Sequence, residues 1–484
     1  MRIIGNDPSV PRQTQGVASG AITNGKAVLV NADGTVAAVA NVATSSSAGT
    51  PVVFNSVNTP AGSVVFDSSN NKIVVAYRDT ADSTGKAVVG TVSGASISFG
   101  TPVQFESGQT PYIRATFDSS NNKVVIAYTD AGNSYYGTAI VGTVSGTSIS
   151  FGTPVVFESG ASISETPGIC FDSTNNKVVI SYRHSSSSNT GKAIVGTVSS
   201  TSISFGSAVT FSSTNVRRMV NAFDSVNGKV VIAYRDYGDA SAGDAIVGTV
   251  SGTSISFGSP TEFNDAVDGI GLNYDVQSGK MVVSFQDDGG FAHGIARVGT
   301  VSGTSISFGT EVTYHAASTS APEHIYDPTT QKTIIAYKDN AVGNVGEFVE
   351  GTVSGTSITF SSPVQFSTSD AIPFDMVYDT DAKKAVIVFS NTATSNRGEA
   401  TVITPGGNYP NLTSENYIGI ARSGAADTKG AIIDTQGAIA DNLSGLTAGQ
   451  SYYVQNDGTL GTTADSPSVF AGTAVSATKL IVKG

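Results

Sequence analysis

Seven pairs of an aromatic residue followed by aspartate recur along the chain at a nearly constant interval. Successive aspartates lie 51 to 54 residues apart, and VGTVSGTSISFG and close variants of NNKVVIAY recur with them. A fixed period of this length is typical of solenoids, propellers or tandem arrays, and the number of strands in a unit distinguishes these folds. The pairs are Phe66-Asp67, Phe117-Asp118, Phe171-Asp172, Phe223-Asp224, Tyr274-Asp275, Tyr326-Asp327 and Tyr378-Asp379.

One unit, residues 113 to 157, indicates what each repeat contains. IRATF ends at Asp118, SSNN forms a turn, and KVVIAYTD follows as the second strand of an inner hairpin. TAIVGTVSG and SISFGTPVVF flank a second turn and form an outer hairpin. Four antiparallel strands with Gly and Asn at the turns are typical of a propeller blade, whereas a β-helix has shorter coils. The sequence therefore predicts an all-β fold, a seven-bladed β-propeller.

The seventh unit lacks its last strand, because no SISFG-type segment follows Gly407. At the other end of the chain, residues 25 to 40 match an outer hairpin in length and turn position. We predict that residues 35 to 54 complete the last blade by pairing with residues 398 to 404, since a closed ring has no exposed edge strand. Residues 25 to 33 could pair in that blade or outside it.

The two ends of the chain differ in character from the repeats. Residues 1 to 24 are polar and include two prolines, so we predict an extended N-terminal arm that could dock onto a partner. From Asn408 onward the period is lost, while short strands and NDG-type turns continue. The predicted organisation is therefore an arm at 1 to 24, a propeller at 25 to 407 and a small C-terminal β-domain at 408 to 484.

Composition and charge narrow the possible partners. The net charge is −12 without runs of Lys or Arg, so we expect no nucleic-acid partner. No apolar stretch is long enough to span a bilayer, and the opening segment lacks the apolar run of a secretory signal. We expect a soluble chain without membrane insertion or conventional secretion. Cys170, the only cysteine, cannot form an intramolecular disulfide and lies in a predicted strand.

The repeated aspartates admit two interpretations. Oxygen ligands recurring around a ring could bind calcium. However, each aspartate ends a strand before a polar turn, where its carboxylate can accept backbone N–H hydrogen bonds, and no EF-hand-type loop accompanies it. We therefore predict a turn role. A more variable second series ends the next strand and suggests local salt bridges or turns, with ligand contact as the alternative: Arg78-Asp79, Thr129-Asp130, Arg183-His184, Arg235-Asp236, Gln286-Asp287, Lys338-Asp339 and Ser390-Asn391.

Residues that could support catalysis do not form a recognisable set. His184, His293, His315 and His324 share no ligand spacing, so we expect no zinc site. No nucleophile elbow, Walker A loop or dinucleotide-binding fingerprint occurs in its required context. We expect no catalytic residue, no cofactor, no metal and no enzymatic activity.

The loops on the two faces of the predicted propeller differ in regularity. DSSNNK and VSGTS recur on one face, whereas segments such as ESGQTPYIR, SSTNVRRMV and HAASTSAPEH are irregular on the other. A regular scaffold that carries diverse loops on one side is the usual layout of a binding surface. The bulky or charged candidates there are Tyr112, Arg114, Arg217, Arg218, Asp268 and His324.

Both termini resemble structural proteins of marine tailed bacteriophages. The segments are ASGAITNGKAVLVNADGTVAAVA near the start, and YIGIARSGAADTKG, SGLTAGQSYYVQNDGTLGTT and AGTAVSATKLIVKG near the end. In such proteins the stretch corresponding to Gly445 to Leu460 lies in a terminal β-module of fibre-like or virion-surface proteins. The repeat also resembles propeller repeats of phage appendage proteins. The resemblance implies a virion location, other virion proteins as partners, and a tail or capsid position.

Three functions from different classes follow. The first is a non-enzymatic virion protein, a tail-associated adhesin or a capsid decoration, that displays the propeller towards a host-surface glycan and could form a homo-oligomer. The second is a carbohydrate-binding lectin-like propeller, against which the absence of Trp counts. The third is a glycan-cleaving enzyme, which would need two carboxylates directed at one bond.

Overall fold

The computed structural model describes residues 12–185, 188–465 and 467–483. Backbone contacts divide the chain into two compact units. The repeat unit comprises Ser45–Gly406, and the terminal unit combines the chain before residue 45 with the chain from residue 407 onward. Within the described residues, no helix is long and apolar enough to cross a membrane. The only helices described are two short 3-10 helices, η1 (Ala131–Asn133) and η2 (Thr392–Thr394).

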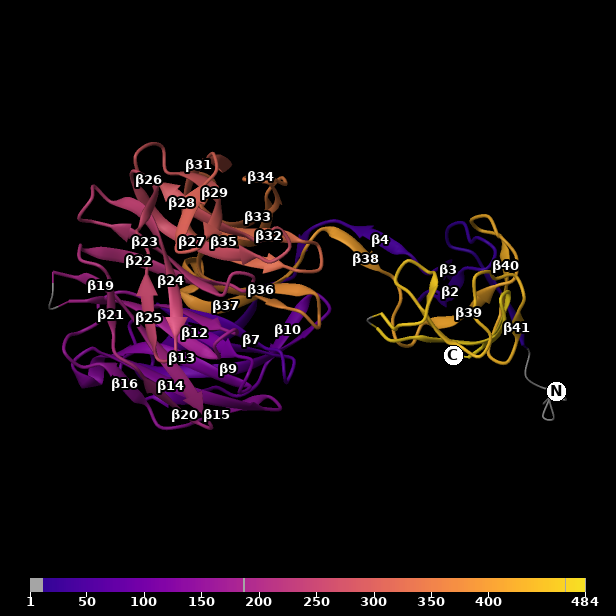
Figure 1. The fold of residues 1–484 in the computed structure, drawn as a ribbon, viewed down its shortest axis with the longest axis horizontal. Coiled ribbons are helices and arrows are strands. Elements are labelled where there is room, and N and C mark those ends of the chain that lie inside the picture. Colours follow the sequence, from indigo (N-terminus) through magenta and orange to yellow (C-terminus); the bar gives the residue numbers. More distant parts are fainter. Residues whose placement is uncertain (1–11, 186–187, 466, 484) are drawn as a thin grey trace. The chain divides into compact units, whose positions relative to one another are not determined.

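Each repeat of the repeat unit is an antiparallel sheet in which consecutive strands pair as neighbours (Figure 1). The first strands of repeats one to seven are β7 (Gly62–Asp67), β12 (Ile113–Asp118), β17 (Gly168–Asp172), β22 (Val216–Asp224), β27 (Val267–Asp275), β31 (Val312–Asp327) and β35 (Val364–Asp379). The second strands are β8 (Lys72–Asp79), β13 (Lys123–Asp130), β18 (Lys177–His184), β23 (Lys229–Asp236), β28 (Lys280–Asp287), β32 (Lys332–Asp339) and β36 (Lys384–Asn391).

The outer half of each repeat contains a long third strand and a fourth strand in two segments. The third strands are β9 (Thr84–Ser93), β14 (Tyr136–Ser145), β19 (Thr190–Ser199), β24 (Ala242–Ser251), β29 (His293–Ser302), β33 (Val345–Ser354) and β37 (Arg397–Thr404). The fourth-strand segments of repeats one to four are β10 (Ser96–Phe99) and β11 (Val103–Glu106), β15 (Ser148–Phe151) and β16 (Val155–Glu158), β20 (Ser202–Phe205) and β21 (Val209–Ser212), and β25 (Ser254–Phe257) and β26 (Thr261–Asn264).

The last three repeats share a continuous ladder. The fourth strands of repeats five and six begin with β30 (Ser305–Phe308) and β34 (Ser357–Phe360), and continue into the first parts of β31 and β35. These two long strands therefore leave one repeat as its fourth strand and enter the next as its first strand. As a result, the three sheets are connected into one sheet of thirteen strands in the described chain.

The first strands surround a common space. Residues of β7, β12, β17, β22, β27, β31 and β35 line a single cavity. Each of these strands also contacts the next in that order, and β35 contacts β7. The repeat unit is thus an all-β, propeller-like fold with an axial channel.

The ring is closed by residues from the N-terminal part of the chain. Two segments, β5 (Ser47–Ala48) and β6 (Val52–Asn58), pair antiparallel with β37 and supply the outer strand that repeat seven lacks. Figure 1 shows β36 and β37, in orange, next to purple strands of the first repeats. Phe54 of β6 packs edge to face against Tyr77, with ring centroids 5.2 Å apart. Closure by an N-terminal strand therefore joins repeats seven and one.

The structure corrects the limits of the predicted closing strand. Residues 35 to 54 were expected to pair with residues 398 to 404, but β3 (Val36–Ala38) pairs with β2 (Ala27–Val30) instead. This hairpin buries Ala27 and Leu29 in the terminal unit, which explains why it does not extend the ring. Residues 25 to 33 likewise lie outside the last blade.

Aromatic side chains connect consecutive repeats. Phe105 at the end of one fourth strand contacts Tyr128 of the next repeat's second strand, with ring centroids 5.3 Å apart. An aromatic pair contributes about 0.5–1.5 kcal/mol beyond the area that it buries. The same contact recurs between Phe157 and Tyr182, Phe211 and Tyr234, Phe263 and Phe285, Tyr314 and Tyr337, and Phe366 and Phe389.

The repeated aspartates form turns, as the sequence predicts. The Asp118 carboxylate accepts hydrogen bonds from the backbone N–H groups of Ser120 and Asn121, both 3.0 Å long, and from the Asn121 amide. The backbone pattern recurs in the other six repeats. Asn122 closes the turn with φ of 55°, a left-handed conformation that Asn tolerates. The turn role is confirmed.

The terminal unit combines both ends of the chain. One sheet contains β1 (Gln13–Val17), β2, β3, β39 (Tyr417–Ala421) and β40 (Gly430–Asp434); a second contains β41 (Ile439–Ala440), β42 (Ser451–Val454), β43 (Leu460–Gly461), β44 (Phe470–Ser476) and β45 (Lys479–Val482). A two-stranded ladder joins β4 (Asn41–Thr44) and β38 (Gly407–Pro410), which run side by side in Figure 1.

Two expectations about the chain ends are therefore corrected. Residues 408 to 484 do not form a domain alone, because Leu29 and Val39 from the N-terminal part of the chain belong to the same hydrophobic core as the strands of residues 408 to 484. Within the expected arm at 1 to 24, β1 pairs with β40 along its whole length. Residues 1 to 11 of that arm lie outside the described residues.

Candidate functional site

Two adjoining cavities occupy the axial channel of the repeat unit. The inner cavity, of about 300 Å³, is lined by the middle of the first strands. The mouth cavity, of about 290 Å³, is lined by the residues that directly precede these in each repeat, next to the irregular loops. Arg114, Val220 and Glu323 line both cavities and therefore lie where the two adjoin.

A partly buried ion cluster lies where the two cavities adjoin. Arg114 Nη2 lies 3.1 Å from Glu323 Oε1, and Arg114 Nη1 lies 3.4 Å from Asp375 Oδ2 and donates to the Phe374 carbonyl. Asp375 also accepts a hydrogen bond from Ser63 Oγ. Burial raises the pKa of Glu323 to about 7, and the Arg114 guanidinium opposes that shift. The cluster joins Arg114 of repeat two to Glu323 and Asp375 of repeats six and seven across the channel.

The residues of this cluster occupy one level of the ring. Each of them pairs with an equivalent position of the second strand in its own repeat. Arg114, for example, lies opposite Ala127, and Glu323 lies opposite Ala336. The complete level consists of Ser63, Arg114, Gly168, Val220, Gly271, Glu323 and Asp375. The small residues leave room in which the long Arg114 side chain reaches across the axis.

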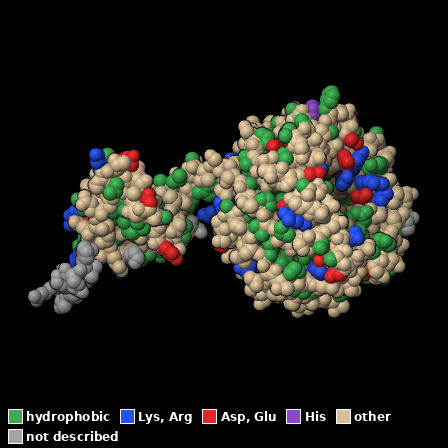
Figure 2. Space-filling view, turned by 180° about the vertical axis from the view of Figure 1, so that it is seen from behind, with side chains coloured by type: hydrophobic (Ala, Val, Ile, Leu, Met, Phe, Trp, Pro, Cys, Tyr) green, Lys and Arg blue, Asp and Glu red, His purple; other side chains and the backbone are tan. Residues whose placement is uncertain are grey.

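The mouth cavity is bordered by arginine-containing ion pairs. Arg218 Nε lies 3.0 Å from Asp268 Oδ1, and Arg235 Nη1 lies 3.3 Å from the same oxygen. Arg217 Nη1 lies 3.5 Å from Glu165 Oε1, and the Arg217 guanidinium stacks over the ring of Tyr237. On the face of the repeat unit seen in Figure 2, basic and acidic side chains are intermingled rather than gathered in blocks of one sign. This arrangement suits a neutral polar ligand better than a polyanion.

Arg218 has an unusual backbone at the mouth. It lies in a β-bulge between the paired positions Arg217 and Val220, and its φ is 54°. The corresponding residues of the next two repeats, Gly269 and Ala321, also have positive φ but carry little or no side chain. A long side chain in this conformation is uncommon, and such strain is concentrated at functional sites. The bulge directs a half-exposed guanidinium to the cavity wall.

The six predicted candidates lie in or beside this region. Tyr112, Arg114 and Arg218 line the mouth cavity, and Asp268 and Arg217 pair with residues of its border. His324 lines the inner cavity and is only 8% exposed, with its ring nitrogens close to Ser284 and Asn273. Burial lowers the pKa of His324 to about 3, so this imidazole is neutral at physiological pH.

Three acidic residues of the site, Glu165, Glu323 and Asp375, were not among the predicted candidates. Glu323 is adjacent to a predicted candidate, and Glu165 lies in the irregular segment ESGASISETPG. Asp375 lies in β35, directly after the irregular segment STSDAIPF. Repeat alignment would have placed Glu323 and Asp375 at the level of Arg114. Their pairing across the axis could not be read from a pattern that describes one repeat at a time.

No protein-family model matches the chain, and no curated protein matches it. Among solved structures it is similar to the BP39L lectin from Burkholderia pseudomallei, with a TM-score of 0.56, 8% identity, and coverage of 73% of this chain and 98% of that chain. AofleA from Arthrobotrys oligospora gives a TM-score of 0.42 at 9% identity, covering 70% of this chain and 96% of that one. The first similarity shows a common all-β fold.

Proposed function

We propose that this protein is a non-enzymatic, lectin-like propeller that binds carbohydrate at the mouth cavity. The observation that carries the proposal is the strained Arg218, which presents a guanidinium to a polar cavity at the axis of a fold shared with a lectin from Burkholderia pseudomallei. Lectin-like binding was the alternative from sequence, and the fold supports it better than it supports a tail fibre.

The chemistry of the mouth cavity fits a sugar. Sugar hydroxyl groups both donate and accept hydrogen bonds, so guanidinium donors such as Arg218 and carboxylate acceptors such as Glu165 can bind neighbouring hydroxyls. Pro322 and Phe374 offer apolar surface for the C–H face of a pyranose ring. A volume of about 290 Å³ is at the small end for ligand sites, which suits one terminal sugar residue.

We propose seven blades for the propeller. The seven sequence repeats, the first strands around one cavity and the closing segments β5 and β6 support this count. Each blade would then contribute a four-stranded sheet, with the last blade built from both ends of the repeat unit.

An immobilised glycan panel tests the proposed function. The full-length protein without a tag should bind a restricted group of glycans that share a terminal sugar, and the free monosaccharide should compete. Absence of binding to every glycan at micromolar protein would contradict the proposal. Cleavage of a bound glycan would contradict the non-enzymatic part.

We further propose a phage particle as the setting, on the resemblance of the terminal segments to virion proteins. The propeller would then bind a host-surface glycan while other virion proteins hold the chain on the tail or capsid. Mass spectrometry of purified virions should detect the protein. Its presence in infected-cell lysate but not in virions would overturn this setting and leave the glycan proposal intact.

A further inference from the structure

At each junction between consecutive repeats, a group of three side chains follows the interrepeat aromatic pair. We call this group a polar station. Three positions define a station. The first is the fourth-strand residue that pairs with a third-strand glycine of the same repeat. The second is the last residue of the second strand of the following repeat, and the third is the residue of that repeat's third strand that pairs with the aromatic residue of its second strand. From the junction of repeats seven and one onward, these sets are Asn55/Asp79/Lys86, Glu106/Asp130/Thr138, Glu158/His184/Lys192, Ser212/Asp236/Asp244, Asn264/Asp287/Ile295, His315/Asp339/Glu347 and Ser367/Asn391/Glu399.

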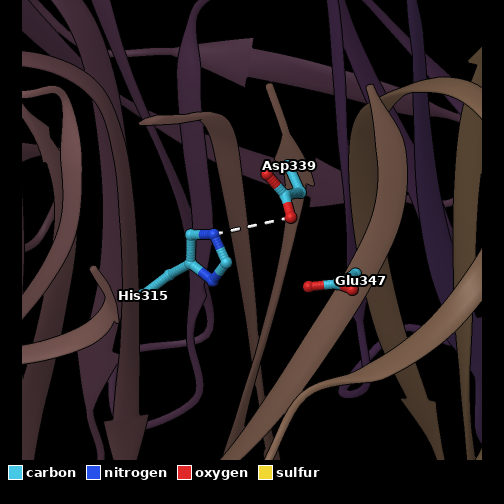
Figure 3. Close-up of side chains that lie close together, drawn as sticks. All are labelled: His315, Asp339 and Glu347. Carbon is cyan, nitrogen blue, oxygen red and sulfur yellow. Dashed lines mark ion pairs between the residues drawn. The ribbon is translucent and has the colours of Figure 1, made fainter. Parts of the chain in front are cut away.

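The station between repeats five and six differs chemically from the others. It alone among these seven sets combines a histidine with two carboxylates, because His315 faces Asp339 and Glu347 (Figure 3). In two other stations a lysine provides the positive charge: Lys86 lies 2.7 Å from Asp79, and Lys192 lies 4.0 Å from Glu158. The fifth-to-sixth station has no such lysine in its set.

The three side chains converge closely enough to bind one ion. One ligand atom from each lies within 4.8 Å of the others. His315 Nε2 is buried and makes no hydrogen bond within the described chain, although Asp339 Oδ2 lies 3.5 Å away. With zinc about 2.1 Å from each donor in a tetrahedral site, these two atoms would be about 3.4 Å apart. The observed separation therefore needs little adjustment.

Neighbouring hydrogen bonds hold the prospective ligands. Asp339 is buried, and its Oδ1 accepts hydrogen bonds from the backbone N–H groups of Ala341 and Val342, which leaves Oδ2 directed at His315. The Tyr337 hydroxyl donates to Glu347 Oε2 at 3.0 Å. Such surrounding hydrogen bonds orient carboxylate ligands in metal sites.

We propose that His315, Asp339 and Glu347 bind a divalent transition-metal ion of the zinc class at the junction of repeats five and six. One imidazole and two carboxylates are ligands that Zn²⁺ accepts, and a water molecule would complete the coordination. Because the ligands come from two repeats, the ion cross-links them and stabilises the ring. Sequence spacing gave no zinc site because the three ligands belong to two adjacent repeats.

Zinc titration of metal-depleted protein without a histidine tag tests the site. Calorimetry should give one bound Zn²⁺ per chain, and the unfolding temperature should rise with free zinc. Co²⁺ in the same site should show the visible absorption of a four-coordinate ion. A wild-type protein that binds no zinc, or zinc binding without a rise in unfolding temperature, would overturn the proposal.

The repeats themselves supply matched variants. His315→Asn should abolish zinc binding yet fold, because Asn55 and Asn264 occupy the equivalent position elsewhere. Glu347→Ile should weaken zinc binding yet fold, since Ile295 occupies the equivalent position at the station between repeats four and five. His184→Asn, at the station between repeats two and three, should leave it unchanged. Zinc affinity that survives His315→Asn, or that is lost in His184→Asn, would contradict the assignment.

Discussion

Glu350 accepts a 2.6 Å hydrogen bond from the backbone N–H of Gly406, 56 residues further along the chain. Its carboxylate also accepts from Ser46 Oγ at 2.8 Å and pairs with Lys332 at 2.7 Å. Ser46 and Gly406 lie at the two ends of the repeat unit. The equivalent residue in the other repeats is Val89, Val141, Val195, Val247, Val298 or Val402. A carboxylate therefore replaces valine at the position that contacts both ends of the repeat unit.

Glu350→Val should destabilise the ring although valine suits this position elsewhere. The change leaves Lys332 without its carboxylate and the Gly406 N–H without its acceptor, and we expect a loss on the order of 2 kcal/mol. Urea unfolding measures it. The double variant with Lys332→Met should recover part of the loss. Unchanged stability in Glu350→Val would contradict the role of Glu350 in closure.

Asp118→Ala tests the turn aspartates. Two backbone N–H groups and one side-chain amide lose their acceptor, so we expect a loss of about 1 kcal/mol. Thermal and urea unfolding measure this change, with and without calcium. A large stabilisation of the wild type by calcium that disappears in Asp118→Ala would show a metal role instead.

Asp244 should make stability depend on pH. Burial and the neighbouring Asp236 carboxylate raise the pKa of Asp244 from 3.8 to about 6. Between these values the folded protein retains a proton that the unfolded chain has lost, so the stability present below pH 4 decreases as the pH rises through 6. Asp244→Asn removes this titration. The free energy of unfolding of the variant minus that of the wild type should therefore be larger at pH 7.5 than at pH 4.5. A difference between the two proteins that is the same at both pH values would contradict the assignment.

Arg218→Gly should fold at least as stably as the wild type. Glycine adopts a φ of 54° without strain, and Gly269 does so at the corresponding position of the next repeat. The lost ion pair with Asp268 contributes little, because the Arg218 side chain is 54% exposed. Urea unfolding should show a change within about 0.5 kcal/mol or a gain. A loss of several kcal/mol would mean that Arg218 is mainly structural.

Much of the fold followed from periodicity. The repeated Phe/Tyr-Asp pairs located the strands and turns, and the missing strand after Gly407 indicated closure by the N-terminal part of the chain. The strands that pair with residues 35 to 44 could not be predicted from the repeat pattern. A hairpin of this kind can join either unit, and the burial of Leu29 in the terminal unit determines which one it joins. The site followed only in part. Arg114 was identified as the last residue of the irregular segment ESGQTPYIR, but its pairing with Glu323 depends on ring geometry.

Carbohydrate binding at the mouth cavity can be measured by calorimetric titration with the monosaccharide that competes best on the glycan panel. We expect one site per chain for the wild type and an affinity at least tenfold weaker in Arg218→Gly. Arg422→Ala serves as the control, because that arginine is 42% exposed in the terminal unit and pairs with Asp434. It should bind like the wild type. Equal affinity in wild type and Arg218→Gly, both stably folded, would contradict carbohydrate binding at the mouth cavity.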